Sequence, residues 1–210
     1  MPENSLSRRS LTTSAVWSVP VVAAAVAAPM AAASVANATL AWSGNASNLA
    51  TLNLLDTGGT VTATALITRP TQFTLTNGDG AISGETGTVT IIVQRPAGIN
   101  IPVGRARGFG VSQYNGVATT SGARTAVYQR AAITNLAYGF PLTSFTTTQP
   151  ITIASNGTLT VPVVFGLAGF SDLLAISAVA TFPVTLSVVV AGRTLSATST
   201  ITVPVGAGVL

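Results

Sequence analysis

Polar and apolar residues alternate one by one along most of this chain from about position 39 onward. Thr or Ser stands at one position and Val, Ile, Leu or Ala at the next, as in 60–67 and 88–94. A period of two places one face of a segment against a core and the other toward water, which is the pattern of a half-buried strand. Gly, Asn, Asp and Pro interrupt it at roughly the 8 to 12 residue spacing of sandwich and barrel proteins. The pattern predicts an all-β protein built as an antiparallel β-sandwich.

The expected strands are short, because proline and turn residues divide the alternation into many pieces. Pro70 and Pro96 each end an expected strand, since proline cannot donate to a ladder. Residues 77–80 are expected to turn, and Asn156-Gly157 is expected to form a hairpin. The expected strands are 39–42, 50–55, 60–67, 72–76, 88–94, 99–103, 108–114, 124–131, 133–138, 144–148, 151–154, 158–165, 175–180, 183–190 and 193–203.

The end of the chain carries the clearest hairpin signal. Segments 183–190 and 193–203 both alternate, and only Ala191-Gly192 separates the second from the first. This ending is similar to the last hairpin of bacterial immunoglobulin-like surface domains. The resemblance implies an immunoglobulin-like sandwich, and the strand pattern is equally consistent with a jelly-roll-like one.

The first 33 residues have the composition of a secretory signal peptide. Arg8 and Arg9 supply a basic segment, and an alanine-rich apolar run follows over 15–33, which is the order that an export signal requires. An uncleaved membrane anchor is the alternative, but two prolines weaken a spanning helix and the run is barely long enough. We expect an N-terminal signal helix within 1–33.

Small residues mark where this leader is expected to be removed. Ala31 and Ala33 fit positions −3 and −1 of a cleavage site, and 36–38 offers a second site. Cleavage after Ala33 leaves 34–210, a length that suits a single domain. A split into two small sandwiches near 96–104 is the alternative organisation.

Ser7, Arg8, Arg9 and Leu11 stand in the order of the twin-arginine export motif, which has Ser or Thr, two Arg, one free position and then Phe or Leu. The leader thus resembles a twin-arginine (Tat) signal peptide, although threonines stand where a lysine commonly follows. The resemblance implies export of a folded protein across a bacterial inner membrane. The export machinery is then a partner, and the membrane is met only through the leader before cleavage. The general export route, which also accepts two Arg, is the rival.

Missing residue types exclude most catalytic chemistry. The chain has no His, Cys or Lys, and only 7% of its residues are charged. A serine hydrolase needs a base, usually His, and serine–lysine chemistry needs Lys. Zinc, haem and iron–sulfur sites need His or Cys. We therefore expect no enzyme activity, no metal and no cofactor.

The charge balance is basic but sparse. All nine basic residues are Arg, against five acids, which gives a net charge of +4 and a pI near 10.7. Nucleic-acid binding needs a dense basic face. We therefore expect no nucleic-acid partner.

Two acidic residues are the remaining candidates for chemistry. Asp79 and Glu85 flank a turn and are expected to lie near each other. A carboxylate pair catalyses glycoside hydrolysis, and the same oxygens together with Asn77 suit Ca²⁺. The spacing matches no known calcium loop. We expect instead that Asp79 favours the turn and that Glu85 keeps the surface soluble.

Residues 104–140 hold the candidate binding surface, because Arg and Tyr are concentrated there. These side chains carry binding energy through stacking and bidentate hydrogen bonds. The alternative is that the aromatic residues are core and the arginines are scattered solvated charges. Trp42 is expected to be core rather than a platform for sugar stacking. The candidate surface comprises Arg105, Arg107, Tyr114, Arg124, Tyr128, Arg130 and Tyr138.

These observations favour a non-catalytic protein that is secreted or held at the cell surface and acts by structure or adhesion. The absence of edge-guarding lysines favours self-association, and the apolar end 203–210 is a candidate strand for a neighbouring subunit. The alternative is a carbohydrate- or other ligand-binding module that uses the 104–140 region, with a surface glycan as partner.

Overall fold

The computed structural model of the protein describes residues 37–97, 106–168 and 180–203. Several expectations therefore concern residues outside the described ranges. These are the export motif (Ser7, Arg8, Arg9, Leu11), the cleavage residues Ala31 and Ala33, the strand 99–103, Arg105, residues 175–179 and the apolar end 204–210.

Strands and one short 3-10 turn account for all the regular elements of the described residues, which confirms the all-β prediction. The alternation of small polar and branched apolar residues produces these strands, since it fits a pleated, half-buried surface. The elements are β1 (Thr39–Asn53), β2 (Thr60–Thr76), β3 (Ile82–Val93), β4 (Gly108–Tyr114), β5 (Val117–Ala118), η1 (Ser121–Ala123), β6 (Arg124–Arg130), β7 (Ala137–Ile153), β8 (Thr158–Ala168), β9 (Ala180–Val190) and β10 (Arg193–Val203).

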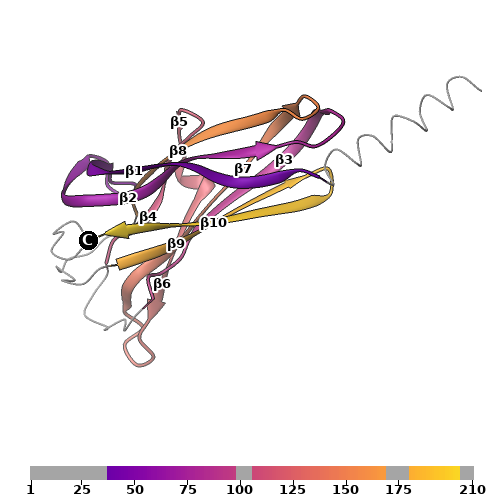
Figure 1. The fold of residues 1–210 in the computed structure, drawn as a ribbon. Helices are drawn as coiled ribbons and strands as arrows, with labels where there is room; N and C mark the ends of the chain where they lie inside the picture. The colour runs from indigo at the N-terminus through magenta and orange to yellow at the C-terminus, as the bar shows by residue number, and fades with distance from the viewer. Residues whose placement is uncertain (1–36, 98–105, 169–179, 204–210) are drawn as a thin grey trace, which may run out of the picture.

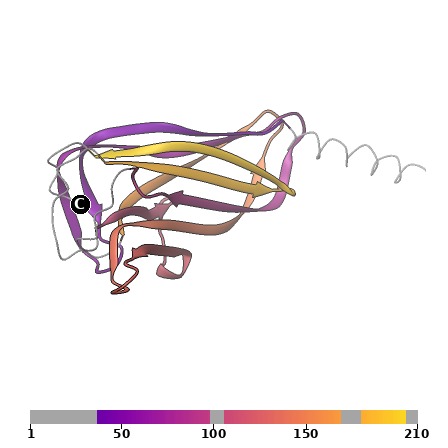
Figure 2. The ribbon, with the colours of Figure 1, turned by 90° about the horizontal axis from the view of Figure 1, so that it is seen from below.

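The strands form a curled antiparallel sheet that makes the fold sandwich-like. Their order is β5-β4-β8-β2-β10-β9-β3-β7-β6, and β1 pairs with β2 off this path. β8 joins two parts of the curl, since it pairs with β2 up to Pro162 and with β4 from Val163 onward. Figures 1 and 2 show the strands running along an elongated body.

Strands from both sides of residues 96–104 pair with each other in this sheet. β3 pairs with β7 and β9, and β2 pairs with β8 and β10. The curl also brings β4 next to β7, where the Thr143 hydroxyl donates to the Phe109 carbonyl at 2.5 Å. The boundaries of a single domain over 34–210 stay a prediction.

Aromatic rings fill the space between the inner faces. Phe182 of β9 lies between Phe109 of β4 and Phe140 of β7, at centroid distances of 5.1 and 5.2 Å. Trp42 of β1 packs edge-on against Phe73 of β2 at 6.0 Å, as expected of a core residue. Edge-to-face pairs of this kind add to the free energy of burial. The rings therefore tie together strands that are distant in the chain.

Hydroxyl groups cover the outer faces in place of charges. The Ser43 and Thr74 hydroxyls lie 2.7 Å apart across β1 and β2, and the Thr125 and Ser144 hydroxyls lie 2.7 Å apart across β6 and β7. Cross-strand Thr and Ser pairs stabilise a sheet modestly. They also explain how a chain with so few charged residues presents a polar exterior.

β1 and β2 are longer than expected, because both pass through residues that usually end a strand. β1 joins the expected strands 39–42 and 50–55 and continues through Gly44, although this residue has a φ of +73°. In β2, Pro70 faces Asn45 of β1. On the other side of β2, the pairing with β10 is at Thr68 and the pairing with β8 begins at Gln72. The expected end at Pro70 is wrong, since this proline falls between two ladders and its missing N–H is not needed there.

β7 merges the expected strands 144–148 and 151–154 by passing through Pro150. This proline pairs with Thr86 of β3, whereas β6 pairs with β7 only as far as Phe145. The second edge of β7 therefore has no described ladder at Pro150, and the missing N–H is tolerated. The expected strand 133–138 is wrong over its first four positions, which turn instead.

Two turns at one end of the sandwich hold each other. The Asn77 N–H donates to the Gly157 carbonyl and the Asn156 N–H donates to the Gly78 carbonyl, both at 2.9 Å. The side chain of Asn77 is buried, and its Nδ2 donates to the Gly80 carbonyl at 2.7 Å. The turn at Asn156 forms, but the expected hairpin is wrong, because β7 and β8 are not neighbours in the sheet.

The last hairpin has the expected geometry. Val190 of β9 pairs with Arg193 of β10. Ala191 and Gly192 between them have φ values of +47° and +73°. A two-residue turn with positive φ at both positions matches the twist of the flanking strands.

Gly166→Ala is expected to destabilise the fold by about 2 kcal/mol, because an added Cβ overpacks the contact (here called the seam) between β8 and residues 53–55. This Cβ would stand 2.6 Å from the backbone carbonyl oxygen of Asn53. The seam is held by the Leu55 N–H, which donates to the Leu167 carbonyl at 2.9 Å. Urea unfolding measures the effect. Gly122→Ala is the control, since nothing lies within 4 Å of its added Cβ, and equal stability of the two variants would contradict this packing.

Candidate functional site

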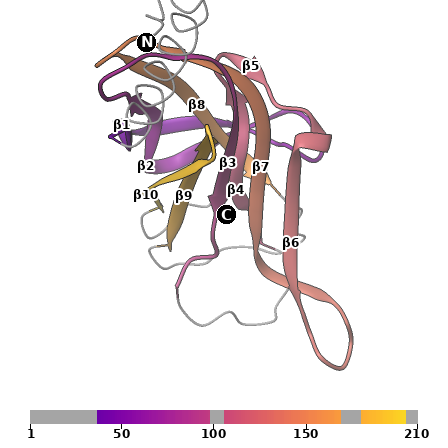
Figure 3. The same cartoon turned by 90° about the vertical axis from the view of Figure 1, so that its right-hand side faces the viewer.

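The β6–β7 hairpin (124–145) projects from the sheet, as Figures 1 and 3 show. Its strands pair from Arg124 opposite Phe145 to Arg130 opposite Ala137. β6 is the last strand in the order of the sheet, so its outer edge meets no described strand. Within the described chain, the hairpin therefore combines an unpaired strand edge with a tip that projects from the sheet.

Arg95 fixes the base of the hairpin to the body. The β6–β7 ladder shifts register between Val127 and Gln129. Arg95 follows β3, and its guanidinium reaches this interruption. Its Nε donates to the Phe140 carbonyl at 3.1 Å and its Nη2 donates to the Val127 carbonyl at 2.7 Å. A charged donor makes these bonds stronger than neutral ones, so the hairpin is held at a defined angle.

Arg95→Gln is expected to loosen the hairpin without unfolding the sheet. The shorter side chain leaves the Val127 and Phe140 carbonyls without their charged donor, so amide exchange in 124–145 should rise about tenfold. Hydrogen exchange read by mass spectrometry measures this, with the β9–β10 hairpin as the internal control. Unchanged exchange in 124–145 would show that Arg95 does not hold the hairpin.

The hairpin tip (131–136) is a tight, apolar turn. The Ala131 N–H donates to the Leu136 carbonyl at 3.0 Å, and the Asn135 N–H donates to the Ala131 carbonyl at 2.9 Å. The side chain of Ile133 is 98% exposed and that of Leu136 is 67% exposed. The backbone bonds therefore hold two large apolar side chains in water.

Positive charge accompanies the tip. Arg130 lies at the end of β6, and its Nη1 donates to the Asn135 carbonyl at 3.0 Å. No acidic residue occurs in the sequence between Glu85 and Asp172. The hairpin thus carries Arg124 and Arg130 with no carboxylate from its own part of the chain.

Four of the sequence-predicted site residues lie on the hairpin. Arg124, Tyr128 and Arg130 lie on β6, and Tyr138 lies on β7 with its ring half-buried. Arg107 lies near the base of the hairpin, because its neighbour Ala106 donates its N–H to the Gly139 carbonyl at 3.1 Å. These five residues stay candidates for a binding surface, whereas Arg105 lies outside the described residues.

Tyr114 does not belong to that surface, and its prediction is wrong. A bulge in β4 between Val111 and Gln113 shifts the alternation by one residue. Tyr114 therefore turns inward on the same side as Phe109 and is only 8% exposed. Its ring centroid lies 5.4 Å from that of Phe145. Packing, and not recognition, is what this tyrosine contributes.

Tyr114→Phe is expected to keep the stability at pH 7 or to raise it by up to about 1 kcal/mol, because the buried phenol oxygen has no hydrogen-bond partner among the described residues. Burial raises the pKa of Tyr114 above its ordinary value. Above about pH 10 the unfolded chain therefore loses this proton first, and the free energy of unfolding falls as pH rises. Denaturant unfolding between pH 8 and 11 should show a shallower fall in the variant, and identical slopes would contradict this assignment.

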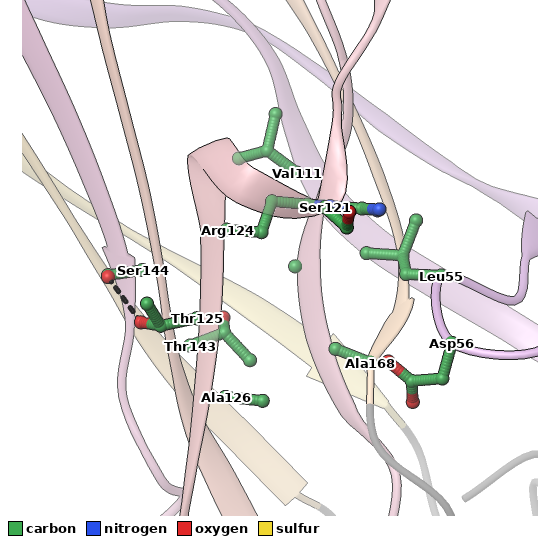
Figure 4. Close-up of a pocket in the computed structure, with 11 residues that line it drawn as sticks. Leu55, Asp56, Val111, Ser121, Arg124, Thr125, Ala126, Thr143, Ser144 and Ala168 are labelled. Carbon is green, nitrogen blue, oxygen red and sulfur yellow. Dashed lines mark hydrogen bonds between the residues drawn. The ribbon is translucent and has the colours of Figure 1, made fainter.

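Arg124 lies at the far end of β6, beside a pocket between β4 and the β6–β7 hairpin (Figure 4). The pocket has a volume of about 100 Å³, which is room for a group of a few heavy atoms. Figure 4 shows Arg124 with Ser121 at one end of the pocket and Asp56 on one side. The remaining lining residues are Leu55, Gly110, Val111, Thr125, Ala126, Thr143, Ser144 and Ala168.

The lining of this pocket combines apolar side chains with a few polar groups. One carboxylate, one guanidinium and several hydroxyl groups line it. Arg124 Nε already donates to the Thr120 carbonyl at 3.2 Å, so its terminal nitrogens are the groups that remain for a ligand. The pocket suits a hydroxyl or carboxylate group of a larger molecule, and its size is well below that of a whole small-molecule site.

The structure places the two acidic candidates on different elements. Asp79 lies on the turn after β2, where its Oδ1 accepts a bond from Asn156 Nδ2 at 3.0 Å. Glu85 lies on β3 opposite Ile151 of β7. Within the described residues, no group of three or more His, Cys, Asp or Glu is placed to hold a metal ion. Asn77 serves the two interlocked turns.

Sequence reasoning missed Arg95, Ile133 and Leu136. In the sequence, Arg95 is only the residue before a strand-ending proline, and the residues that accept its hydrogen bonds lie 32 and 45 positions away in the chain. Ile133 alternates with Thr134 and therefore resembles a strand residue locally. The sequence does contain one signal for the tip. Two alanines follow Arg130 and break the alternation of polar and apolar residues there.

Comparison of the chain with protein-family models and with curated proteins found no match. Among the residues that the structure describes, no helix is long and apolar enough to cross a membrane.

Proposed function

We propose that this chain is a non-catalytic exported protein that acts at the cell surface as a structural or adhesive β-sandwich, with the β6–β7 hairpin as its contact element. The hairpin is the observation that carries the proposal. It holds Ile133 and Leu136 in water on a tip fixed by backbone bonds, and Arg95 anchors its base. The leader pattern and the missing catalytic residue types support the surface location and the absence of catalysis.

Export is tested by the N-terminus of the mature chain and the cell fraction that contains it. We expect the protein outside the cytoplasm, beginning at Ser34. Changing both Arg8 and Arg9 to Lys should block export by the twin-arginine route, whereas Glu3→Gln, a charge change elsewhere in the leader, should not. A chain that keeps Met1 and stays in the cytoplasm would refute the surface function.

A ligand-binding role is the second candidate, and the pocket beside Arg124 favours it. The guanidinium, the Asp56 carboxylate and the surrounding hydroxyls suit a polar group of a saccharide. Binding on a glycan array that is lost in Arg124→Gln and kept in Arg130→Gln would favour this role. Binding that survives Arg124→Gln would exclude this pocket.

A further inference from the structure

We infer that the hairpin tip is an insertion device for an anionic lipid surface. Ile133 and Leu136 would enter the boundary between headgroups and acyl chains, and Arg130 would meet lipid phosphates. The inference rests on the proposed surface location and adds how the protein is retained there. It departs from the expectation that the chain meets a membrane only through its leader.

The hairpin tip exposes two large apolar side chains. Ile133 is 98% exposed and Leu136 is 67% exposed, although most large apolar side chains of the described chain are in the core. Both stand on one turn whose backbone bonds keep it closed. An apolar knob on a fixed turn needs no complementary groove in a partner, and a fluid bilayer can close around it.

Tyr138 and Arg130 flank the hairpin tip and suit the headgroup region of a bilayer. Tyr138 on β7 is two residues from Leu136, which corresponds to about 7 Å along an extended strand. Interfacial elements reach about 5 to 10 Å into the headgroup region, so Tyr138 would lie at headgroup level when the tip is inserted. Tyrosine favours that level because its ring is apolar and its hydroxyl is polar. Arg130 has a long stem with a charged end, which can reach the phosphates.

The positive charge beside the tip favours anionic lipids. The segment between Glu85 and Asp172 contains five arginines and no acid. Arg130 lies at the tip end of β6, whereas Arg124 lies at the opposite end of β6 in a pocket lined also by Asp56, and Arg95 lies at the base of the hairpin. The cationic side chain of Arg130 beside an apolar tip complements an anionic bilayer, because an Arg near such a surface strengthens binding.

The absence of cysteine gives a direct test. A single Ile133→Cys variant of the exported protein is labelled with a polarity-sensitive fluorophore, and a Val117→Cys variant serves as control because Val117 is exposed but lies on β5. Vesicles of equimolar phosphatidylglycerol and phosphatidylcholine should shift the emission of the label at 133 to the blue. The label at 117 should not shift, and neither should the label at 133 with phosphatidylcholine alone.

Unlabelled variants measure the contributions in co-sedimentation with the same vesicles. Ile133→Asn is expected to weaken binding about 30-fold, which corresponds to roughly 2 kcal/mol for one buried apolar side chain. Val117→Asn should leave binding unchanged. Arg130→Gln should weaken it about fivefold at low salt and Arg130→Lys should restore most of it, because the charge is what the lipid surface attracts.

Three results would overturn the inference. The first is no emission shift at 133 with the anionic vesicles. The second is an equal shift at 133 and 117, or with neutral vesicles. The third is a shift that depends on protein concentration without lipid, which would assign the tip to a second copy of the chain. Each of these results leaves the export test untouched, so a failure of lipid binding is distinguishable from a failure of the proposed surface function.

Discussion

Phe182→Ala is expected to lower the free energy of unfolding by about 4 kcal/mol, which is the usual size for a buried aromatic ring. Phe182 is fully buried, and its ring meets Phe109 and Phe140 at 5.1 and 5.2 Å. It belongs to β9, whereas its neighbours belong to β4 and β7. Loss of the ring removes contacts that hold the curled sheet onto itself, and adjacent strands cannot replace them.

Urea unfolding at pH 7 measures this effect, with Val189→Ala as the control. Val189 is on the same strand but 40% exposed, so its truncation should cost less than about 1 kcal/mol. A Phe182→Ala variant no less stable than the Val189→Ala variant would mean that the inner faces do not close on each other as described.

Asn77→Asp is expected to cost about 3 kcal/mol at pH 7, although it changes almost no atoms in shape. Asn77 Nδ2 donates to the carbonyls of Gly80 at 2.7 Å and of Ala154 at 3.1 Å, and the residue is 3% exposed. A carboxylate has no donor for these oxygens, and a buried charge facing them is strongly unfavourable. The two interlocked turns then lose the group that joins them.

The loss of stability in Asn77→Asp should become smaller as the pH falls. Burial beside carbonyl oxygens should raise the pKa of the introduced carboxyl above its unfolded value, so lowering the pH through the folded pKa restores a proton donor and part of the stability. Asp79→Asn is the control, because its oxygen can still accept the bond from Asn156. An Asn77→Asp variant as stable as the wild type at pH 7 would contradict the role of this side chain.

Local alternation was enough to predict the fold class and many strands, but not where strands end. Whether Pro70 ends a strand depends on which ladder partner lies beside it, and those partners come from β8 and β10, far along the chain. Pro150 is tolerated for the same kind of reason, since β6 has ended before it. Whether a proline ends a strand thus depends on pairing with distant segments, and the residue type alone does not determine it.

The candidate site shows the same limit. Tyr114, Tyr128 and Tyr138 are one residue type in one region, but a bulge in β4 sends Tyr114 into the core. The binding surface therefore stays a prediction for Tyr128 and Tyr138, and it is wrong for Tyr114. The sequence predicts a strand at the apolar tip, because Ile133 fits the alternation. Its exposure follows from the turn at 131–136, which the backbone bonds reveal.

Retention of the protein at the cell surface should depend on the two apolar side chains of the hairpin tip. Cells that produce the wild-type chain and cells that produce the double variant Ile133→Asn, Leu136→Asn are fractionated, and the mature protein is measured in the envelope and the medium. Both side chains are exposed, so the variant should fold and be exported normally. We expect the wild type to stay with the envelope and the variant to be released into the medium. An identical distribution of the two exported proteins would contradict the role of the hairpin as the contact element.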